Sequence, residues 1–146
     1  MANSKLMAFV IVAAMLLMPS SVVAASISIS SVSLPATVNQ GDTFTTTMSV
    51  SGSSVSSVSG TLTLPSGLSC TPTSSQTISL DSSGVGTGSW SCTASVAGDY
   101  TNQITAGVSA TDSSTGSSVS DSKQSGLRVL SPASLSVTSS IVAGSV

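Results

Sequence analysis

Apolar and small polar residues alternate along most of this chain, which is the pattern of half-buried β-strands. In the segment 43–50 the odd positions all carry Thr or Ser, whereas the even positions share the other face and are Phe44, Thr46, Met48 and Val50. A second such face is formed by Gly88, Trp90, Cys92, Ala94 and Val96. Each segment therefore predicts a strand with one buried face and one hydroxyl-covered face.

Further strands are predicted between turn signals at 39–42, 81–84 and 112–118. The first strand has Ile27 and Ile29 on its apolar face and then, after a change of phase, Val32 and Leu34. The apolar positions of the next strands are Val58, Gly60, Leu62 and Leu64; Ile78 and Leu80; and Ile104, Ala106, Val108 and Ala110, which continue the face of Tyr100. A last strand is predicted around 119–130, with a bulge at Ser125–Gly126. We expect 51–57 to be a flexible loop. About seven strands in roughly 105 residues, without a helix, predict a single all-β sandwich.

The expected core contains the largest apolar residues of these inner faces. They are Phe44, Leu62, Leu64, Trp90 and Ile104. Trp90 is interpreted as a core residue over a disulfide, in preference to a surface platform for stacking sugars.

The first 25 residues predict export. Lys5 precedes an apolar run of 13 residues, 6–18, which Pro19 ends, and Ala24 and Ala25 offer small residues for cleavage. Spanning a bilayer takes roughly 20 residues, so a cleaved signal is favoured over an uncleaved membrane anchor. We expect a secreted or cell-surface protein with a signal peptide at 1–25, a sandwich at 26–131 and a distinct segment at 132–146.

Two cysteines, Cys70 and Cys92, are present in the whole chain. In an exported protein such a pair most simply forms one disulfide. Free thiols remain an alternative. A metal site would need further ligands such as His, and the sequence has none.

The composition argues against an enzyme. Ser catalysis requires a base, and the sequence has no His. Glycoside hydrolysis requires two placed carboxylates, and a calcium site requires closely spaced acidic ligands. The acidic residues are isolated from one another: Asp42, Asp81, Asp99, Asp112 and Asp121. Asp42, Asp81 and Asp112 lie in predicted turns, where an Asp side chain caps its own backbone. We expect no catalytic, cofactor-binding or metal-binding residues.

The net charge also limits the partners. After residue 25, Lys123 and Arg128 stand against the five Asp, which gives −3. Nucleic acids and anionic lipids require clustered Lys and Arg, so neither is expected, and no membrane span is expected after signal cleavage. The expected partners are other copies of the chain or other surface proteins, with glycans left open. O-glycosylation of the many Ser and Thr residues also stays open.

Short motifs resemble known surface modules. The stretch 41–45, Gly-Asp-Thr-Phe-Thr, followed by 62–68, Leu-Thr-Leu-Pro-Ser-Gly-Leu, resembles immunoglobulin-like modules of archaeal and bacterial surface proteins, in particular the NEW3-type and CARDB-type adhesion-related modules. Ala97-Gly98-Asp99-Tyr100-Thr101 is similar to the turn before a late strand of such domains. The resemblance implies an immunoglobulin-like fold and a role as a spacer, a sugar-associated accessory module or a surface repeat. It implies no shared catalytic residues.

The first strand is repeated near the carboxyl end. Residues 25–31, Ala-Ser-Ile-Ser-Ile-Ser-Ser, return at 133–139 as Ala-Ser-Leu-Ser-Val-Thr-Ser. Three explanations stay open: the start of a second domain, a donor strand that completes a neighbouring subunit, or an extra edge strand of the same domain. The candidate assembly residues are Ser134, Leu135, Val137 and Ile141.

These observations lead to three hypotheses about function. The first is a non-enzymatic structural protein of the cell surface, such as a surface-layer, sheath, filament or adhesion module. The second is a carbohydrate-binding accessory module. The third is a filament subunit that assembles by strand exchange through its tail.

Overall fold

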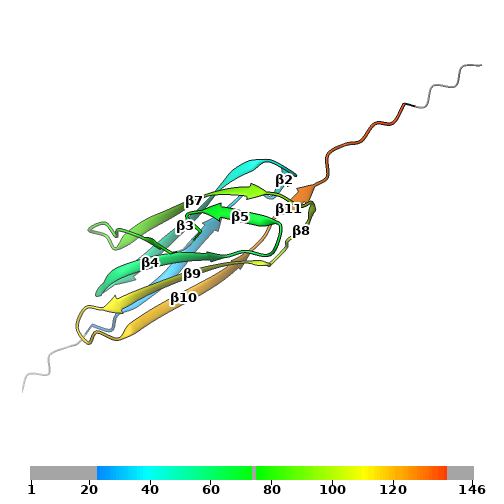
Figure 1. Ribbon diagram of the computed structural model, residues 1–146. Helices are drawn as coiled ribbons and strands as arrows, with labels where there is room; N and C mark the ends of the chain where they lie inside the picture. Colours follow the sequence, from blue (N-terminus) through cyan, green and yellow to red (C-terminus); the bar gives the residue numbers. More distant parts are fainter. Residues whose placement is uncertain (1–22, 74, 138–146) are drawn as a thin grey trace, which may run out of the picture.

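The computed structural model describes residues 23–73 and 75–137, which form an elongated β-sandwich (Figure 1). The proposed signal up to residue 22 and the tail from residue 138, with Ile141, lie outside the described residues. The described part contains no helix, and its strands are β1 (Ser26–Ser33), β2 (Thr37–Asn39), β3 (Thr43–Ser53), β4 (Val55–Thr63), β5 (Leu68–Thr71), β6 (Gln76–Thr77), β7 (Val85–Ala94), β8 (Gly98–Asp99), β9 (Ile104–Asp112), β10 (Ser118–Ser125) and β11 (Arg128–Leu130).

Two four-stranded sheets form the layers of the sandwich. The first sheet has the order β1-β3-β7-β5, and the second has the order β10-β9-β4-β6. When the seven longer strands are lettered A to G in chain order, the sheets become A-B-E-D and G-F-C, the arrangement of constant-type immunoglobulin domains. The predicted all-β sandwich of about seven strands is confirmed, and β6 is a short addition at the edge of the second sheet.

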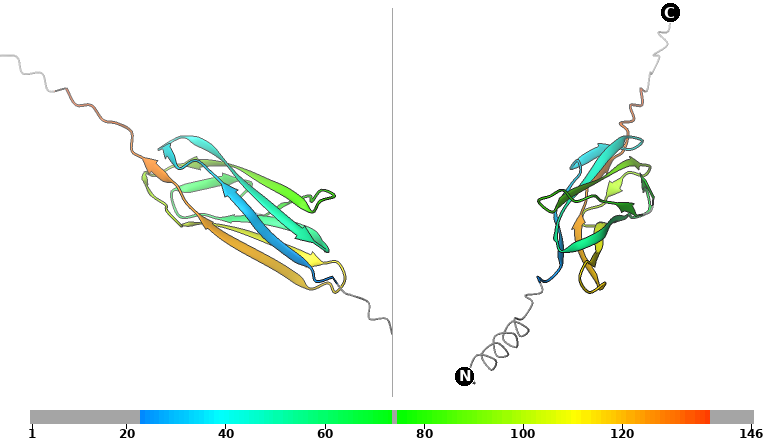
Figure 2. Two further views of the ribbon diagram at one scale, coloured as in Figure 1. Left: turned by 180° about the vertical axis from the view of Figure 1, so that it is seen from behind. Right: turned by 90° about the vertical axis from the view of Figure 1, so that its left-hand side faces the viewer.

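A small third sheet closes the end of the sandwich at which the chain leaves. Its order is β2-β11-β8, with β11 parallel to β2 and antiparallel to β8. The chain enters at the opposite end: Ser26 pairs with Ser53 at the end of β3, whereas Leu130 pairs with Asn39, shortly before β3 begins. Figures 1 and 2 show the two chain ends leaving in opposite directions.

The period of two decides which side chains enter the core. In β3, Phe44, Thr46, Met48 and Val50 are all buried, and in β7 every even position from Gly86 to Ala94 is buried. The change of phase in β1 is a bulge between Ile29 and Ser31. An extra residue at a bulge turns the following side chains to the other face, which is how one strand carries apolar residues at odd and then at even positions.

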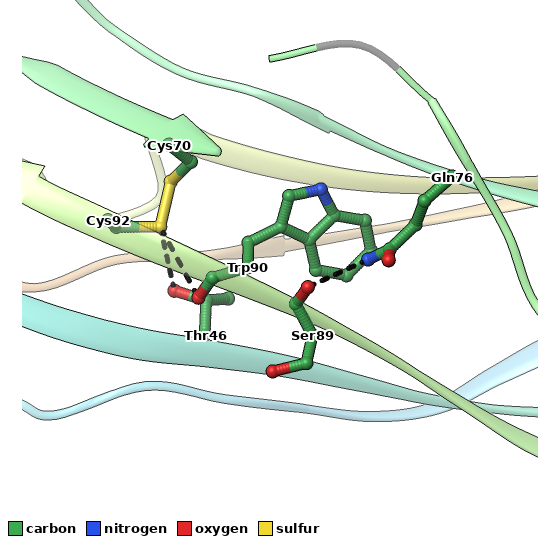
Figure 3. The surroundings of a disulfide bond; sticks show 6 residues. All are labelled: Thr46, Cys70, Gln76, Ser89, Trp90 and Cys92. Carbon is green, nitrogen blue, oxygen red and sulfur yellow. Dashed lines mark hydrogen bonds between the residues drawn. A yellow bond between two sulfur atoms is a disulfide. The ribbon is translucent and has the colours of Figure 1, made fainter. Parts of the chain in front are cut away.

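Trp90 fills the space between the two sheets. Its exposed fraction is 1%, which confirms its assignment to the core (Figure 3). Two glycines make room for the ring: a Cβ on Gly60 would lie 3.2 Å from the indole Cη2 atom, and one on Gly88 would lie 2.9 Å from it. Because Gly60 belongs to β4 and Trp90 to β7, the ring joins the two layers.

The segment 51–57 is not a flexible loop, so that prediction was wrong. Residues 51–53 complete β3, and β4 begins at Val55. The chain crosses from one sheet to the other at Ser54, whose φ of +56° is a left-handed conformation. A serine-rich composition predicts flexibility, but small side chains also allow the chain to pass tightly from one sheet to the other.

Further details differ from the predictions. Leu62 and Leu64 are only partly buried, and Val96 is exposed because β7 ends at Ala94. Ile78 and Leu80 follow the short strand β6 instead of forming it. The last predicted strand breaks at the expected bulge: β10 ends at Ser125, and after Gly126 the chain continues as β11 in another sheet. The short strands β2, β5 and β8 were not predicted.

We predict that Trp90→Ala destabilises the fold by about 3–5 kcal/mol, because it removes a large buried ring and leaves a cavity. Denaturant unfolding monitored by far-UV circular dichroism measures this loss. Trp90→Phe keeps an apolar ring in the slot and is expected to lose much less. Val85→Ala, at a 44% exposed position of the same strand, serves as the surface control. Equal stability of Trp90→Ala and the wild type would exclude a core role.

Candidate functional site

The disulfide Cys70–Cys92 fastens an edge strand to its neighbour. The two cysteines are direct register partners in β5 and β7, with Cα atoms 4.0 Å apart, and both are buried. In antibody domains the disulfide instead crosses between the sheets. Here it holds β5, which is four residues long and pairs with β7 alone among the described strands. The sulfur of Cys92 also lies 3.6 Å from the buried hydroxyl of Thr46 (Figure 3).

Charged side chains of β10 close one side of the sandwich, where the edge strands β1 and β10 meet. The backbone N–H of Ile29 donates to Oδ2 of Asp121 at 2.8 Å. The ammonium group of Lys123 donates to the carbonyl of Ser30 at 3.3 Å. Both contacts fall at the bulge of β1, so the N–H of Ile29 and the carbonyl of Ser30 at this edge already have partners. Charges at an edge strand also discourage pairing with another chain.

The other carboxylates cap turns or strand ends. Asp81 accepts hydrogen bonds from the backbone and hydroxyl of Ser83 at 2.8 and 2.6 Å. Asp112 accepts the same pair from Ser114 at 2.8 and 2.7 Å, and Asp99 accepts them from Thr101. Asp42 accepts from the backbone and side chain of Asn39. The predicted turn roles of Asp42, Asp81 and Asp112 are confirmed.

These hydrogen bonds favour the ionised carboxyl groups. The hydroxyl of Ser114, together with its backbone N–H and the hydroxyl of Thr115, lowers the pKa of Asp112 from 3.8 to about 2. The pKa of Asp81 is lowered mainly by the hydroxyl of Ser83, and that of Asp99 mainly by the hydroxyl of Thr101. The groups are therefore ionised at neutral pH, and each accepts hydrogen bonds within its own turn.

No group of three or more His, Cys, Asp or Glu side chains capable of holding a metal occurs in the described ranges. A hollow of about 450 Å³ between 52–55 and 80–84 has one carboxylate, Asp81, in its wall. Another of about 330 Å³, where β11 ends, contains Asp99 and Arg128.

The three aromatic residues that follow residue 25 are all buried. Trp90 is 1% exposed, Tyr100 7% and Phe44 9%. The hydroxyl of Tyr100 donates to the carbonyl of Val96 at 2.9 Å, a contact of the tyrosine-corner type found in immunoglobulin-like domains. These rings are committed to packing, so none of them offers a face to a sugar.

Hydroxyl groups cover the outer face of the first sheet. The exposed positions of β3 and β7 are in register, so that Thr43 lies opposite Thr93 and Thr45 opposite Ser91. At the border with β1, the hydroxyl oxygens of Ser28 and Ser51 are 3.0 Å apart. No charged residue lies on these three strands. The polar groups of this face are neutral hydroxyls, and Val85 is an exposed apolar residue at its end.

Ser134, Leu135 and Val137, the candidate assembly residues within the described part, lie on a segment that leaves the body of the molecule. Residues 131–137 belong to no strand and are all exposed. Leu135 is 89% exposed and Val137 is 81% exposed. Within the described part of the tail, no pairing with the chain's own sheets occurs, and Figure 1 shows the segment pointing away from the sandwich. Ser134 and the two apolar residues are therefore free to contact another molecule.

Sequence reasoning missed the role of Asp121, although a signal for it exists. Asp81, Asp99 and Asp112 are each followed two residues later by Ser or Thr, whose hydroxyl and backbone N–H donate hydrogen bonds to the carboxylate. Asp121 is followed at that position by Lys123. Its carboxylate is therefore left for a longer-range partner, the N–H of Ile29.

We predict that acid weakens the fold through Asp112. Because its pKa is lower in the folded chain, its contribution is complete above about pH 4 and is lost as the pH falls towards about 2. Asp112→Asn keeps one acceptor oxygen for the turn but cannot titrate, so its stability should vary less over this range. Denaturation midpoints of the variant and the wild type at several pH values measure the difference. Parallel acid curves for Asp112→Asn and the wild type would contradict the assignment.

We also predict that Asp121→Ala destabilises the fold by about 1–3 kcal/mol, because the N–H of Ile29 loses its partner at a partly buried site. Hydrogen exchange of the Ile29 amide should accelerate more than that of amides in β7. Ser122→Ala, at the neighbouring exposed position of β10, is expected to change little. Unchanged exchange at Ile29 in the Asp121→Ala variant would show that the carboxylate does not close this edge.

No helix in the described ranges is long and apolar enough to cross a membrane. Comparison with known proteins adds no relative: no family model matches the chain, and no curated protein is significantly similar to it. Its function is therefore inferred from the fold and the contacts described above.

Proposed function

We propose that the chain is a non-enzymatic structural module of the cell exterior, of the kind used in surface layers, sheaths, filaments or adhesion proteins. The observation that carries the proposal is the position of the two chain connections. They leave opposite ends of an elongated sandwich, so a module of this shape transmits tension from one neighbour to the next (Figures 1 and 2). The expected export signal and the disulfide agree with a place outside the cell.

The strands at the two ends suit this task because tension acts along them. β1 pairs with β3 over residues 26–33, and β11 pairs in parallel with β2 over 128–130. Backbone hydrogen bonds between strands lie across the strand direction. Pulling on Ser26 and Leu130 therefore shears several bonds at once, instead of opening them one after another.

We also propose that the module is related to the immunoglobulin-like repeats of surface proteins. Its support is the A-B-E-D and G-F-C strand order together with the motifs at 41–45 and 62–68. A carbohydrate-binding role is less well supported, because stacking on sugar rings requires exposed aromatics. Phe44, Trp90 and Tyr100 are all inside the fold.

Single-molecule pulling tests the mechanical role. We expect the domain to resist a higher force when pulled through residues 26 and 130 than when pulled through residues 26 and 53. The second pair lies side by side at the open end of the β1–β3 pair and opens it bond by bond. Forced unfolding reports the rate of crossing the unfolding barrier along the chosen direction.

The same molecule pulled in two directions is its own control for overall stability. Equal unfolding forces in the two directions would contradict a design for tension. Arg128→Pro removes the hydrogen bond from the N–H of Arg128 to the carbonyl of Ala36, at the border between β11 and the β2 segment. It should lower the force more in the first direction than in the second.

A further inference from the structure

The amphipathic tail is built like a strand of the first sheet. Its residues 134–137 alternate Ser with Leu or Val, and they repeat residues 26–29 of β1. In β1 the two isoleucines are buried at 8% and 7% exposure, and the serines lie on the hydroxyl-covered face. In the tail the corresponding residues, Leu135 and Val137, are among the most exposed apolar side chains described.

The first sheet has two edges, and they differ in how they are protected. At β1 the carboxylate of Asp121 and the ammonium of Lys123 occupy backbone groups around the bulge. At the other edge, β5 has no strand partner on its outer side among the described residues. Neither β5 nor the tail segment 131–137 carries a charge. The N–H of Leu68 donates to the carbonyl of Pro65 in the preceding turn. The rest of this uncharged edge has no strand partner, and such an edge is a template for another strand.

We propose that the tail of one copy adds to the β5 edge of a second copy and so joins subunits head to tail. This inference rests on the proposed structural function and names its partner, another copy of this chain. The two segments match in length and pattern: β5 is Leu68-Ser69-Cys70-Thr71, with its apolar residues buried and its hydroxyls exposed. The added strand places Leu135 and Val137 beside the inner side of β5 and continues the hydroxyl face outward with Ser134 and Ser136.

The position of the tail favours a neighbour over the chain's own edge. The segment leaves at the β2-β11-β8 end and points away from the sandwich (Figure 2). One tail and one edge per copy, at different places on the surface, make a heterologous contact, which repeats into an open chain of subunits. Main-chain pairing supplies affinity, and the apolar side chains at alternate positions supply register.

The disulfide makes this edge suitable as an acceptor. A strand of four residues at the border of a sheet is a weak platform by itself. The bond between Cys70 and Cys92 ties the middle of β5 to β7, so that tension applied to β5 passes directly into the sheet.

Light scattering over a concentration series of the mature chain is the first test. We expect the average mass to rise to at least twice that of the monomer. Leu135→Ser with Val137→Ser, and separately Ser69→Lys at the acceptor edge, should restore the monomer without changing the melting temperature. Ser91→Lys places the same charge on the same face, one strand further in, and should leave the assembly intact. A wild-type chain that stays monomeric at all concentrations would overturn the proposal.

A photo-crosslinker at position 136 then locates the acceptor. In a mixture of ¹⁵N-labelled and unlabelled chains, we expect crosslinks between copies at residues 68–71. Crosslinks within one copy, or to another strand, would overturn the proposal. If the chain is monomeric but still resists pulling through residues 26 and 130, the tail contact is excluded and the proposed structural function stands. If the chain assembles but unfolds at equal force in both directions, the mechanical role is excluded and the tail contact stands.

Discussion

The insertion of Trp90 between Gly60 and Gly88 is the contact on which the rest of the sandwich depends. The inner faces otherwise consist mainly of small and medium side chains, such as Ala94, Ala106 and Val108. One large ring spans both layers and contacts positions from each. Close packing of an interior requires matching volumes across it, so the two glycines and the indole fix the separation and the alignment of the sheets together. The hydroxyl faces, the terminal sheet and the free β5 edge all take their positions from that alignment.

Much of this fold follows from local physics that the sequence displays directly. A period of two marks buried faces wherever a strand has one wet side, as in β3, β7 and β9. Turn residues such as Gly41, with a φ of +93°, mark where strands end. The burial of Trp90 followed from the same alternation, whereas the disulfide followed from the presence of two cysteines in a chain with an expected export signal.

The parts that were not predicted depend on contacts between distant segments. β2, β8 and β11 are two or three residues long and form because three segments that are distant in the sequence meet at one end of the sandwich. The crossing at Ser54 depends on one left-handed residue within a run of serines, which has no distinct composition. The link between Asp121 and Ile29 spans 92 positions in the sequence. For the candidate site, the alternation of Ser with Leu or Val in the tail is visible in the sequence. The sequence does not show that the β1 edge is protected by charged groups and that the β5 edge is not.

The placement of the charges has a consequence for the solvent conditions that the domain tolerates. Charged groups of the described residues sit at turns, at strand ends or along the β1–β10 border, and the outer face formed by β1, β3 and β7 has none. Dissolved ions weaken charge–charge interactions within a Debye length of about 10 Å at 0.1 M salt, but they have little to screen on a neutral hydroxyl surface. The electrostatic potential of this face therefore changes little as the ionic strength rises. A module with such a face presents the same electrostatic surface when the ionic strength of its surroundings changes.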